Sequence, residues 1–396
     1  MPIFFRCLVI FGPLLAVFVH FFGPMAERLW AVPWQTVSME VKSPTALRIG
    51  ILGAATIAPL AIVWPASQKV DVVVTAVAAR DLLRAEDFAR RHGIPKVHTS
   101  YEALLSDPDI DAVYVPTPNG LHRDWSVKAM KAGKHVLCEK PFAANKEDAA
   151  EMLKVSKETD KVLMEAFHYR FHPLAKEMEK VVLSGKLGKI VRIDVAGELP
   201  SLFVPDHDIR YNIGGRDPKL AGGALMDIGP YAVNCFRLLA RAAGVQNFEV
   251  VNVTAKEKFP KVESWLKAEM TAGHIPGSIT ASMEMSLLGI FKARAVVQGE
   301  LGTMTVENFI VPFVYHTLTV NMKDGSSESV QQHYDEEHRT TYHLQLDAFA
   351  EAVQRKQQRK QPIFDSAGGT PEDAIENMDV IDKIYTKLGW GPRVGY

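Results

Sequence analysis

In this 396-residue chain, Lys140 occupies a position from which its ammonium group could bind a substrate. It lies in Glu139-Lys140-Pro141, directly after the apolar segment His135–Cys138. If that segment is a strand of a parallel sheet, Lys140 lies at the carboxyl edge, where such sheets bind ligands. An ammonium group there can hydrogen-bond a substrate oxygen and stabilise negative charge that develops on it. The alternative is a solvated lysine that happens to follow a strand.

Asp227 and Tyr231 form a second candidate group. They are four residues apart, so a helix over Ala224–Ala242 would place both on one face near its N-terminus. Gly222-Gly223, just before that helix, allows close approach of another backbone segment. The phenol can exchange a proton with a hydroxyl group if nearby positive charge lowers its pKa from about 10, and Asp227 can orient the reacting groups. The alternatives are a carboxylate favoured by the helix dipole and a packed aromatic ring.

Three polar residues follow the apolar segment Val162–Phe167: His168, Tyr169 and Arg170. They lie at the end of the last strand expected in the same sheet. A hydroxylated small molecule is recognised by several fixed donors and acceptors, which these side chains can supply. We therefore predict that they bind the substrate. His168 and His172 can alternatively be ordinary residues at a domain interface.

The segment Leu47–Ala58 predicts a nucleotide-binding turn. An apolar strand leads into Gly53-x-Ala55-x-x-Ala58, which resembles the pattern G-x-G-x-x-G/A with alanine in the middle position. Small side chains let the backbone approach a pyrophosphate, and the following helix supplies N–H donors and a positive dipole. Cofactor contacts are expected from four residues of this turn, namely Gly53, Ala55, Thr56 and Ile57. A tight strand–helix turn without a ligand is the alternative.

The next apolar run, Asp71–Ala78, ends at Ala79-Arg80-Asp81. An acidic residue at this strand tip binds the ribose hydroxyls of NAD, whereas an arginine pairs with the 2′-phosphate of NADP. We therefore predict that Ala79 and Arg80 contact the cofactor and that NADP is preferred. Two alternatives remain: Asp81 could bind the ribose hydroxyls of NAD, and Arg80 could be a solvated residue at a strand end.

A proline-containing loop follows the strand expected over Asp111–Val115. Its two prolines stiffen the backbone, and polar groups flank them. Further cofactor contacts are expected from this loop and from the neighbouring strand end, at Pro116, Thr117, Pro118, Asn119, His122 and Glu139.

The elements that position these residues alternate between strand and helix from residue 47 to residue 167. This order predicts an α/β fold with a doubly wound parallel sheet, a Rossmann fold, over residues 47–167. From residue 168 the pattern changes to consecutive strands, roughly over residues 248–322. That pattern is typical of an α+β domain with an open, mostly antiparallel sheet. We expect residues 168–396 to form this second domain, which would bind substrate, carry the oligomer contact and end in helices.

The composition, with 47% hydrophobic and 23% charged residues and a net charge of −1, fits a globular protein with a large core. It gives no reason to expect a nucleic-acid partner. Three cysteines do not make a disulfide framework, and no Cys/His spacing indicates a metal site.

The N-terminal segment differs in kind. Residues 2–24 are almost wholly apolar, close to the roughly 20 residues that span a bilayer. We expect residues 1–25 to be a transmembrane helix that attaches the protein to a membrane, on an undetermined side, and residues 26–46 to be a linker. A cleaved signal peptide and an interfacial anchor are the alternatives.

Four motifs, in this order, resemble the Gfo/Idh/MocA family of glucose–fructose oxidoreductase and inositol dehydrogenase. They are the turn at residues 53–58, Tyr114–His122, Glu139-Lys140-Pro141 and Gly222–Tyr231. The resemblance runs from residue 47 to the end and is closest to the D-xylose 1-dehydrogenase (NADP+) and trans-dihydrodiol dehydrogenase branch. This branch has tyrosine at the position of Tyr231, whereas many family members have histidine. The chain departs from the branch at His168-Tyr169, where Trp-Thr is common.

The resemblance implies that Lys140 is catalytic, with Tyr231 and Asp227, and that the Lys140–Pro141 bond is often cis. It implies a homodimer and an NADP-dependent dehydrogenase, with NAD as the second choice. The expected substrate is a sugar or a cyclic diol. The first expectation is D-xylose, which would be oxidised to a lactone. Alternatives are a trans-1,2-dihydrodiol dehydrogenase, another specialised dehydrogenase, an enzyme that eliminates or hydrolyses through transient oxidation, and a catalytically silent NADP-binding regulatory protein.

Overall fold

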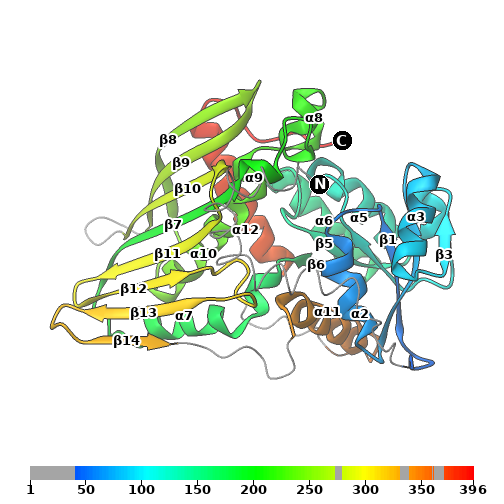
Figure 1. The fold of residues 1–396 in the computed structure, drawn as a ribbon, viewed down its shortest axis with the longest axis horizontal. Coiled ribbons are helices and arrows are strands. Elements are labelled where there is room, and N and C mark those ends of the chain that lie inside the picture. The colour runs from blue at the N-terminus through cyan, green and yellow to red at the C-terminus, as the bar shows by residue number, and fades with distance from the viewer. Residues whose placement is uncertain (1–40, 273–278, 331–338, 359, 361–369) are drawn as a thin grey trace, which may run out of the picture.

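Two sheets lie side by side in the computed structural model (Figure 1), which describes residues 41–272, 279–330, 339–358, 360 and 370–396. The first sheet has six parallel strands in the order β3-β2-β1-β4-β5-β6. This order reverses direction between β1 and β4, and such a switch point is where doubly wound sheets bind nucleotides. The prediction of a parallel Rossmann sheet is therefore confirmed.

The strands of this sheet are short, apolar and largely buried. They are β1(Leu47–Leu52), β2(Val72–Ala78), β3(Lys96–His98), β4(Ala112–Val115), β5(His135–Glu139) and β6(Leu163–Ala166). Between them run a π-helical turn η1(Pro59–Val63) and the helices α2(Trp64–Ser67), α3(Leu82–His92), α4(Tyr101–Leu105), α5(His122–Lys131) and α6(Lys146–Thr159). Polar N-caps start three of these helices: Asp81 for α3, Ser100 for α4 and Asn145 for α6.

The second sheet has eight strands in the order β14-β13-β12-β11-β7-β10-β9-β8. They are β7(Ile190–Pro200), β8(Phe248–Phe259), β9(Val262–Ala272), β10(Ile279–Gly289), β11(Lys292–Gly299), β12(Gly302–Glu307), β13(Thr317–Met322) and β14(Ser327–Val330). All neighbours are antiparallel except β7 and β10. Alternate residues of β10, β11 and β12 are buried, so one face of the sheet packs on helices. This confirms the predicted second sheet.

Helices and short turns join the two sheets. They are η3(His168–Phe171), α7(Pro173–Leu183), η4(Ser201–Phe203), η5(Ile209–Tyr211), α8(Asn212–Gly215), η6(Pro218–Leu220), α9(Ala224–Asp227), α10(Gly229–Ala242), α11(Thr341–Gln357) and α12(Pro371–Lys387). In Figure 1, α10 and α12 lie between the sheets, whereas α11 returns to the first sheet beside α2. Phe349 and Leu346 of α11 belong to the same buried cluster as Ile49 of β1. The C-terminal part of the chain therefore contributes to both layers.

The helix expected over Ala224–Ala242 is two helices. α9 ends at Asp227 and α10 begins at Gly229, with Pro230 in its first turn. A proline nitrogen carries no hydrogen, so it cannot continue the bonding pattern of the preceding helix, but it suits a helix start. Asp227 and Tyr231 therefore belong to successive helices rather than to one face of a single helix.

The prediction of a membrane attachment is corrected. Within the described ranges, no helix is both long enough and apolar enough to cross a membrane. The predicted anchor at residues 1–25, and the linker up to residue 40, lie outside the described residues. The apolar run alone suggested the attachment, and the structure offers it no support.

Candidate active site

A cavity of about 460 Å³ opens at the carboxyl ends of β1, β2 and β4. Gly53, Ala54 and Ala55, which follow β1, form part of its wall. Gly53 has a φ of +127°, which side-chain-bearing residues rarely adopt, and a β-carbon there would lie 3.4 Å from the Tyr101 hydroxyl oxygen. The turn therefore needs glycine at this position.

The other wall of the cavity comes from β2, α3, α4 and the loop after β4. Ala79, Arg80, Asp81, Arg84, Tyr101, Pro116, Thr117, Pro118 and Ile209 line it. Asp81 is already engaged, because its Oδ1 accepts a hydrogen bond from Arg84 N at 3.2 Å. Arg80 is exposed, so its guanidinium can reach a ligand at this end.

Seven of the predicted cofactor residues line this cavity: Gly53, Ala55, Ala79, Arg80, Pro116, Thr117 and Pro118. The structure does not bring the other five to its wall, namely Thr56, Ile57, Asn119, His122 and Glu139. Asn119 Nδ2 donates to Ala221 O at 2.9 Å, which joins the loop to the segment before α9.

His122 and Glu139 form hydrogen bonds that stabilise the region around the cavity loop and Lys140. The His122 ring lies between Thr117 O, at 2.7 Å, and Pro141 O, at 2.8 Å. Burial lowers the pKa of this imidazole to about 4. Glu139 Oε1 accepts a hydrogen bond of 2.6 Å from the Tyr114 hydroxyl. His122 thus connects the cavity loop to the loop that carries Lys140, and Glu139 joins the end of β5 to β4.

These features fit a dinucleotide. The cavity lies at the switch point of the sheet, its turn needs glycine, and two guanidinium groups border one end. Thr117 Oγ1 is buried and has no hydrogen-bond partner among the described residues. Because buried hydroxyl groups are normally hydrogen-bonded, this atom is suited to a ligand contact.

Lys140 lies next to this cavity, at the end of β5, and the bond to Pro141 is cis, as the resemblance implied. Its Nζ donates to Asp227 Oδ1 at 3.0 Å and to Asp227 O at 2.9 Å. The other carboxylate oxygen, Oδ2, accepts from Arg210 Nε at 2.8 Å. Burial alone would raise the pKa of Asp227, but the charges of Lys140 and Arg210 lower it to about 2. The carboxylate therefore stays ionised between two cations.

Tyr231 lies over the same lysine. Lys140 Nζ is 5.2 Å from the centroid of its ring, and Phe167 stacks on the ring at 5.0 Å. The phenol oxygen is 2.9 Å from His168 Nε2. The structure thus brings together Lys140, His168, Asp227 and Tyr231, which come from three separate segments of the sequence.

In the structure of the chain alone, the pKa of Tyr231 differs from the lowered value that the sequence analysis considers. We expected the charge of Lys140 to lower the pKa of the phenol. Instead burial raises this pKa well above its usual value, and the charges of Glu139 and Asp227 act in the same direction. Asp227 neutralises much of the lysine charge because it binds the ammonium group directly.

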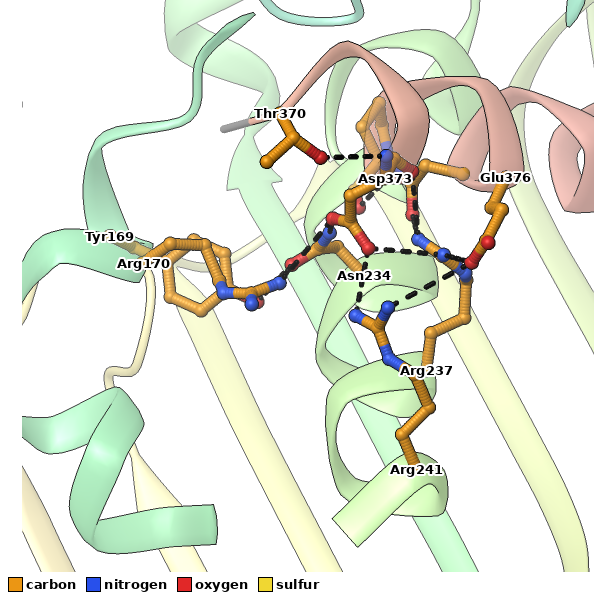
Figure 2. A network of polar contacts seen from close by, with 10 residues as sticks. Tyr169, Arg170, Asn234, Arg237, Arg241, Thr370, Asp373 and Glu376 are labelled. Atoms are coloured by element: carbon orange, nitrogen blue, oxygen red, sulfur yellow. Dashed lines mark hydrogen bonds and ion pairs between the residues drawn. The ribbon is translucent and has the colours of Figure 1, made fainter. Parts of the chain in front are cut away.

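Tyr169 and Arg170 have buried partners elsewhere. The Tyr169 hydroxyl and Arg170 Nη1 both donate to Asn234 Oδ1 at 2.7 Å. Figure 2 shows both side chains directed toward Asn234 of α10 and Asp373 of α12. Of the three predicted substrate residues, His168 is hydrogen-bonded to Tyr231, and the ring of Tyr169 packs edge-on against Tyr231 with the centroids 5.8 Å apart.

The sequence analysis missed four residues at this site: Arg84, Tyr101, Ile209 and Arg210. Arg84 lies four residues after Arg80, in the first turn of α3, and this closeness in the sequence could have indicated it. The other three lie on segments that carry no nucleotide-binding pattern, and only the fold brings them here.

Comparison with known proteins supports this assignment. Residues 47–167 match the family model described as "Oxidoreductase family, NAD-binding Rossmann fold" (GFO_IDH_MocA). D-xylose 1-dehydrogenase (NADP(+)) 2 of Haloferax volcanii is 44% identical over 48% of the chain and 57% of its own length. Trans-1,2-dihydrobenzene-1,2-diol dehydrogenase of Mus musculus is 30% identical over 67% of the chain and 76% of its own length.

A solved structure extends the likeness to both sheets. KijD10, a 3-ketoreductase from Actinomadura kijaniata in complex with NADP and TDP-benzene, matches with a TM-score of 0.74 and 26% identity. That match covers 89% of this chain and 99% of the other. By contrast, the alignment with the Haloferax enzyme spans little more than half of that enzyme.

The two sheets and the cavity match those expected of an oxidoreductase family with an NAD-binding Rossmann fold. The chain belongs to the Gfo/Idh/MocA family.

Proposed function

We propose that the protein is an NADP-dependent dehydrogenase that oxidises a carbinol group of a sugar or cyclic diol, with D-xylose as the first substrate to test. The observation that carries this proposal is the convergence of Lys140 and Tyr231 beside the dinucleotide cavity. Lys140 Nζ lies 5.2 Å from the centroid of the Tyr231 ring, and Lys140 directly follows β5, the neighbour of the cavity strand β4. The relatives in Haloferax volcanii and Mus musculus support the substrate class.

Arg80 supports the choice of NADP over NAD. Its exposed guanidinium borders the cavity at the tip of β2, and Arg84 lies beside it. A planar guanidinium matches the oxygens of a 2′-phosphate, whereas the acidic residue that would bind ribose hydroxyls, Asp81, caps α3 instead.

Residues of the chain then transfer the proton of the substrate hydroxyl and stabilise the charge on its oxygen. When bound, the cofactor supplies the nicotinamide that accepts a hydride. Lys140 donates a hydrogen bond to the substrate oxygen and stabilises the charge that develops there, while Asp227 fixes the ammonium group. Tyr231 exchanges the hydroxyl proton with the substrate. Both side chains are largely shielded from water, which strengthens these interactions.

A second candidate is the reduction of a keto sugar linked to a nucleotide. The specific observation is the match with KijD10, which spans both sheets of this chain. Arg210, beside Asp227 and about one-third exposed in its side chain, could bind an anionic substrate group.

The test is a spectrophotometric assay of the protein at the absorbance of the reduced nicotinamide. D-xylose, D-glucose, inositols and trans-1,2-dihydrodiols are offered with NADP and with NAD, and a dTDP-linked keto sugar is offered with NADPH. Reduction of NADP by a pentose or cyclic diol is the expected result. Oxidation of NADPH by the dTDP-linked substrate alone would favour the second candidate. Bound cofactor without turnover of any substrate would contradict both.

A further inference from the structure

We propose that His168 and Thr341 are positioning residues for Tyr231, joined to its hydroxyl in a short hydrogen-bonded chain. The inference rests on the function proposed above for Tyr231 and adds two residues that act through it. His168 thereby has a role other than the substrate contact predicted from the sequence. Thr341, from the start of α11, is brought to the site by the return of that helix to the first sheet.

The geometry places the imidazole between two hydroxyl groups. His168 Nε2 lies 2.9 Å from the Tyr231 hydroxyl oxygen, and His168 Nδ1 lies 2.9 Å from Thr341 Oγ1. The two partners come from α10 and α11, and Thr341 is 173 residues from His168 in the sequence. All three residues are buried, Thr341 completely. Each ring nitrogen therefore has one protein partner and little access to water.

Packing fixes the plane of the ring. Tyr342 lies against the His168 ring, with centroids 4.3 Å apart. Phe167 stacks on the ring of Tyr231, with the centroids 5.0 Å apart. With both rings held, the hydroxyl of Tyr231 has one fixed partner, and its position relative to Lys140 is set.

The chemistry of the chain suits a phenol that must gain and lose a proton. A neutral imidazole has one N–H donor and one acceptor nitrogen, whereas a threonine hydroxyl both donates and accepts. When Tyr231 is a phenol, it can donate to Nε2 while Nδ1–H donates to Thr341. When Tyr231 is a phenolate, Nε2–H can donate to it while Thr341 donates to Nδ1. The two arrangements differ by the phenol proton, which Tyr231 exchanges with the substrate oxygen, and by the tautomer of the neutral imidazole. Neither form leaves a buried polar atom without a partner, which would be costly.

The surroundings keep the ring neutral, as this scheme requires. Burial lowers the pKa of His168 to about 3, and the positive charge of Lys140 adds to the effect. The groups that face Tyr231 are of mixed sign: Lys140, Glu139, Asp227, Glu165 and the neutral phenol of Tyr342. A charged imidazolium would therefore add a second cation beside Lys140.

The test uses the full chain labelled with ¹³C at the Cζ of tyrosine. The chain has ten tyrosines, and the Tyr231→Phe variant identifies the resonance of Tyr231. Thr341→Val and His168→Phe, which keep the size of each side chain, should both displace this resonance. Thr340→Ala is the matched control, because Thr340 bonds His343 at the same helix start but does not touch His168.

Kinetics supply the second readout. With NADP and D-xylose, Thr341→Val and His168→Phe should lower kcat about tenfold with little change in KM, and Thr341→Ser should retain more activity than Thr341→Val. In a Tyr231→Phe background, neither substitution should lower kcat further.

An unchanged Tyr231 resonance in both variants, or an equal displacement in Thr340→Ala, would overturn the inference. Equal losses of kcat with and without Tyr231 would overturn it as well. The resonance needs no turnover, so it decides the inference even if the assay shows that the proposed substrate is wrong. Conversely, a loss of activity in Tyr231→Phe with no effect of His168→Phe would leave the proposed function intact and remove only this inference.

Discussion

Neighbouring residues limit what several charged side chains near the cavity can do. Lys140 is bonded to Asp227, which is also bonded to Arg210, so one carboxylate orients two cations. Asp81 is used as a helix cap, which leaves the exposed Arg80, at the tip of β2, as the polar side chain that faces the cavity. We therefore derive the cofactor prediction from Arg80.

Arg80→Ala should raise the KM for NADP about 10- to 100-fold and leave the KM for NAD nearly unchanged. The reason is the loss of charge-assisted hydrogen bonds to the 2′-phosphate, which NAD lacks. Steady-state kinetics with both cofactors measure this. Arg90→Ala, in the following helix α3 and largely exposed, serves as the control. Equal changes for NADP and NAD would contradict the assigned role.

At the scale of elements, a buried ionic network joins α10 to α12. Figure 2 shows Asp373, in the first turn of α12, surrounded by the guanidinium groups of Arg170, Arg237 and Arg241. Burial alone would raise the pKa of Asp373, but these charges, that of Arg237 foremost, lower it. Thr370 caps the same helix, since its Oγ1 accepts from Asp373 N at 3.0 Å. The network therefore fixes the helix that lies between the sheets.

Arg237→Leu should lower the free energy of unfolding by about 3 kcal/mol, because it removes a fully buried partner of Asp373. Arg241→Leu should cost less, about 1 kcal/mol, since the Arg241 side chain is 30% exposed and screened by water. Chemical denaturation followed by circular dichroism compares the two. Losses of equal size would show that burial of Arg237 does not govern its contribution.

At the scale of the molecule, stability should depend on pH through Glu165 of β6. This carboxyl is 2% exposed, and burial, followed by the negative charge of Asp373, raises its pKa to about 8. The folded protein therefore keeps this proton between pH 4.5 and 8, whereas the unfolded chain loses it. The contribution is complete below the unfolded pKa and is lost as the pH rises toward 8.

Glu165→Gln should remove this dependence. Relative to the wild type, its free energy of unfolding should increase by up to about 1.4 kcal/mol per pH unit between pH 5 and pH 8. Denaturation curves at these pH values measure the difference, with the exposed Glu158→Gln as control. A difference that stays constant with pH would contradict the raised pKa.

The first sheet could be predicted from the sequence because the patterns that indicate its strands, helices and turns each lie within a short segment. Strands of apolar residues alternate with helices, two of which begin at the polar N-caps Ser100 and Asn145. The turn at Gly53 and the loop at Thr117 were likewise found from their own residues.

Contacts between distant segments could not be predicted in this way. Nothing near Arg170 in the sequence indicates that it pairs with Asp373, and nothing near His168 indicates Thr341. The break between α9 and α10 was missed although Pro230 marks it, because the apolar period continues across the break. The apolar run before residue 25 suggested a membrane anchor, for which no described helix provides support.

The most direct test of the account is the turnover of Lys140→Met, measured together with cofactor binding. Its kcat for NADP reduction should fall roughly 100-fold or more, because the substrate oxygen loses its donor, while fluorescence titration still detects NADPH binding. Lys154→Met, at an exposed position of α6, is the control. Near-normal turnover by Lys140→Met with bound cofactor would contradict the central claim that Lys140 and Tyr231 form the catalytic site.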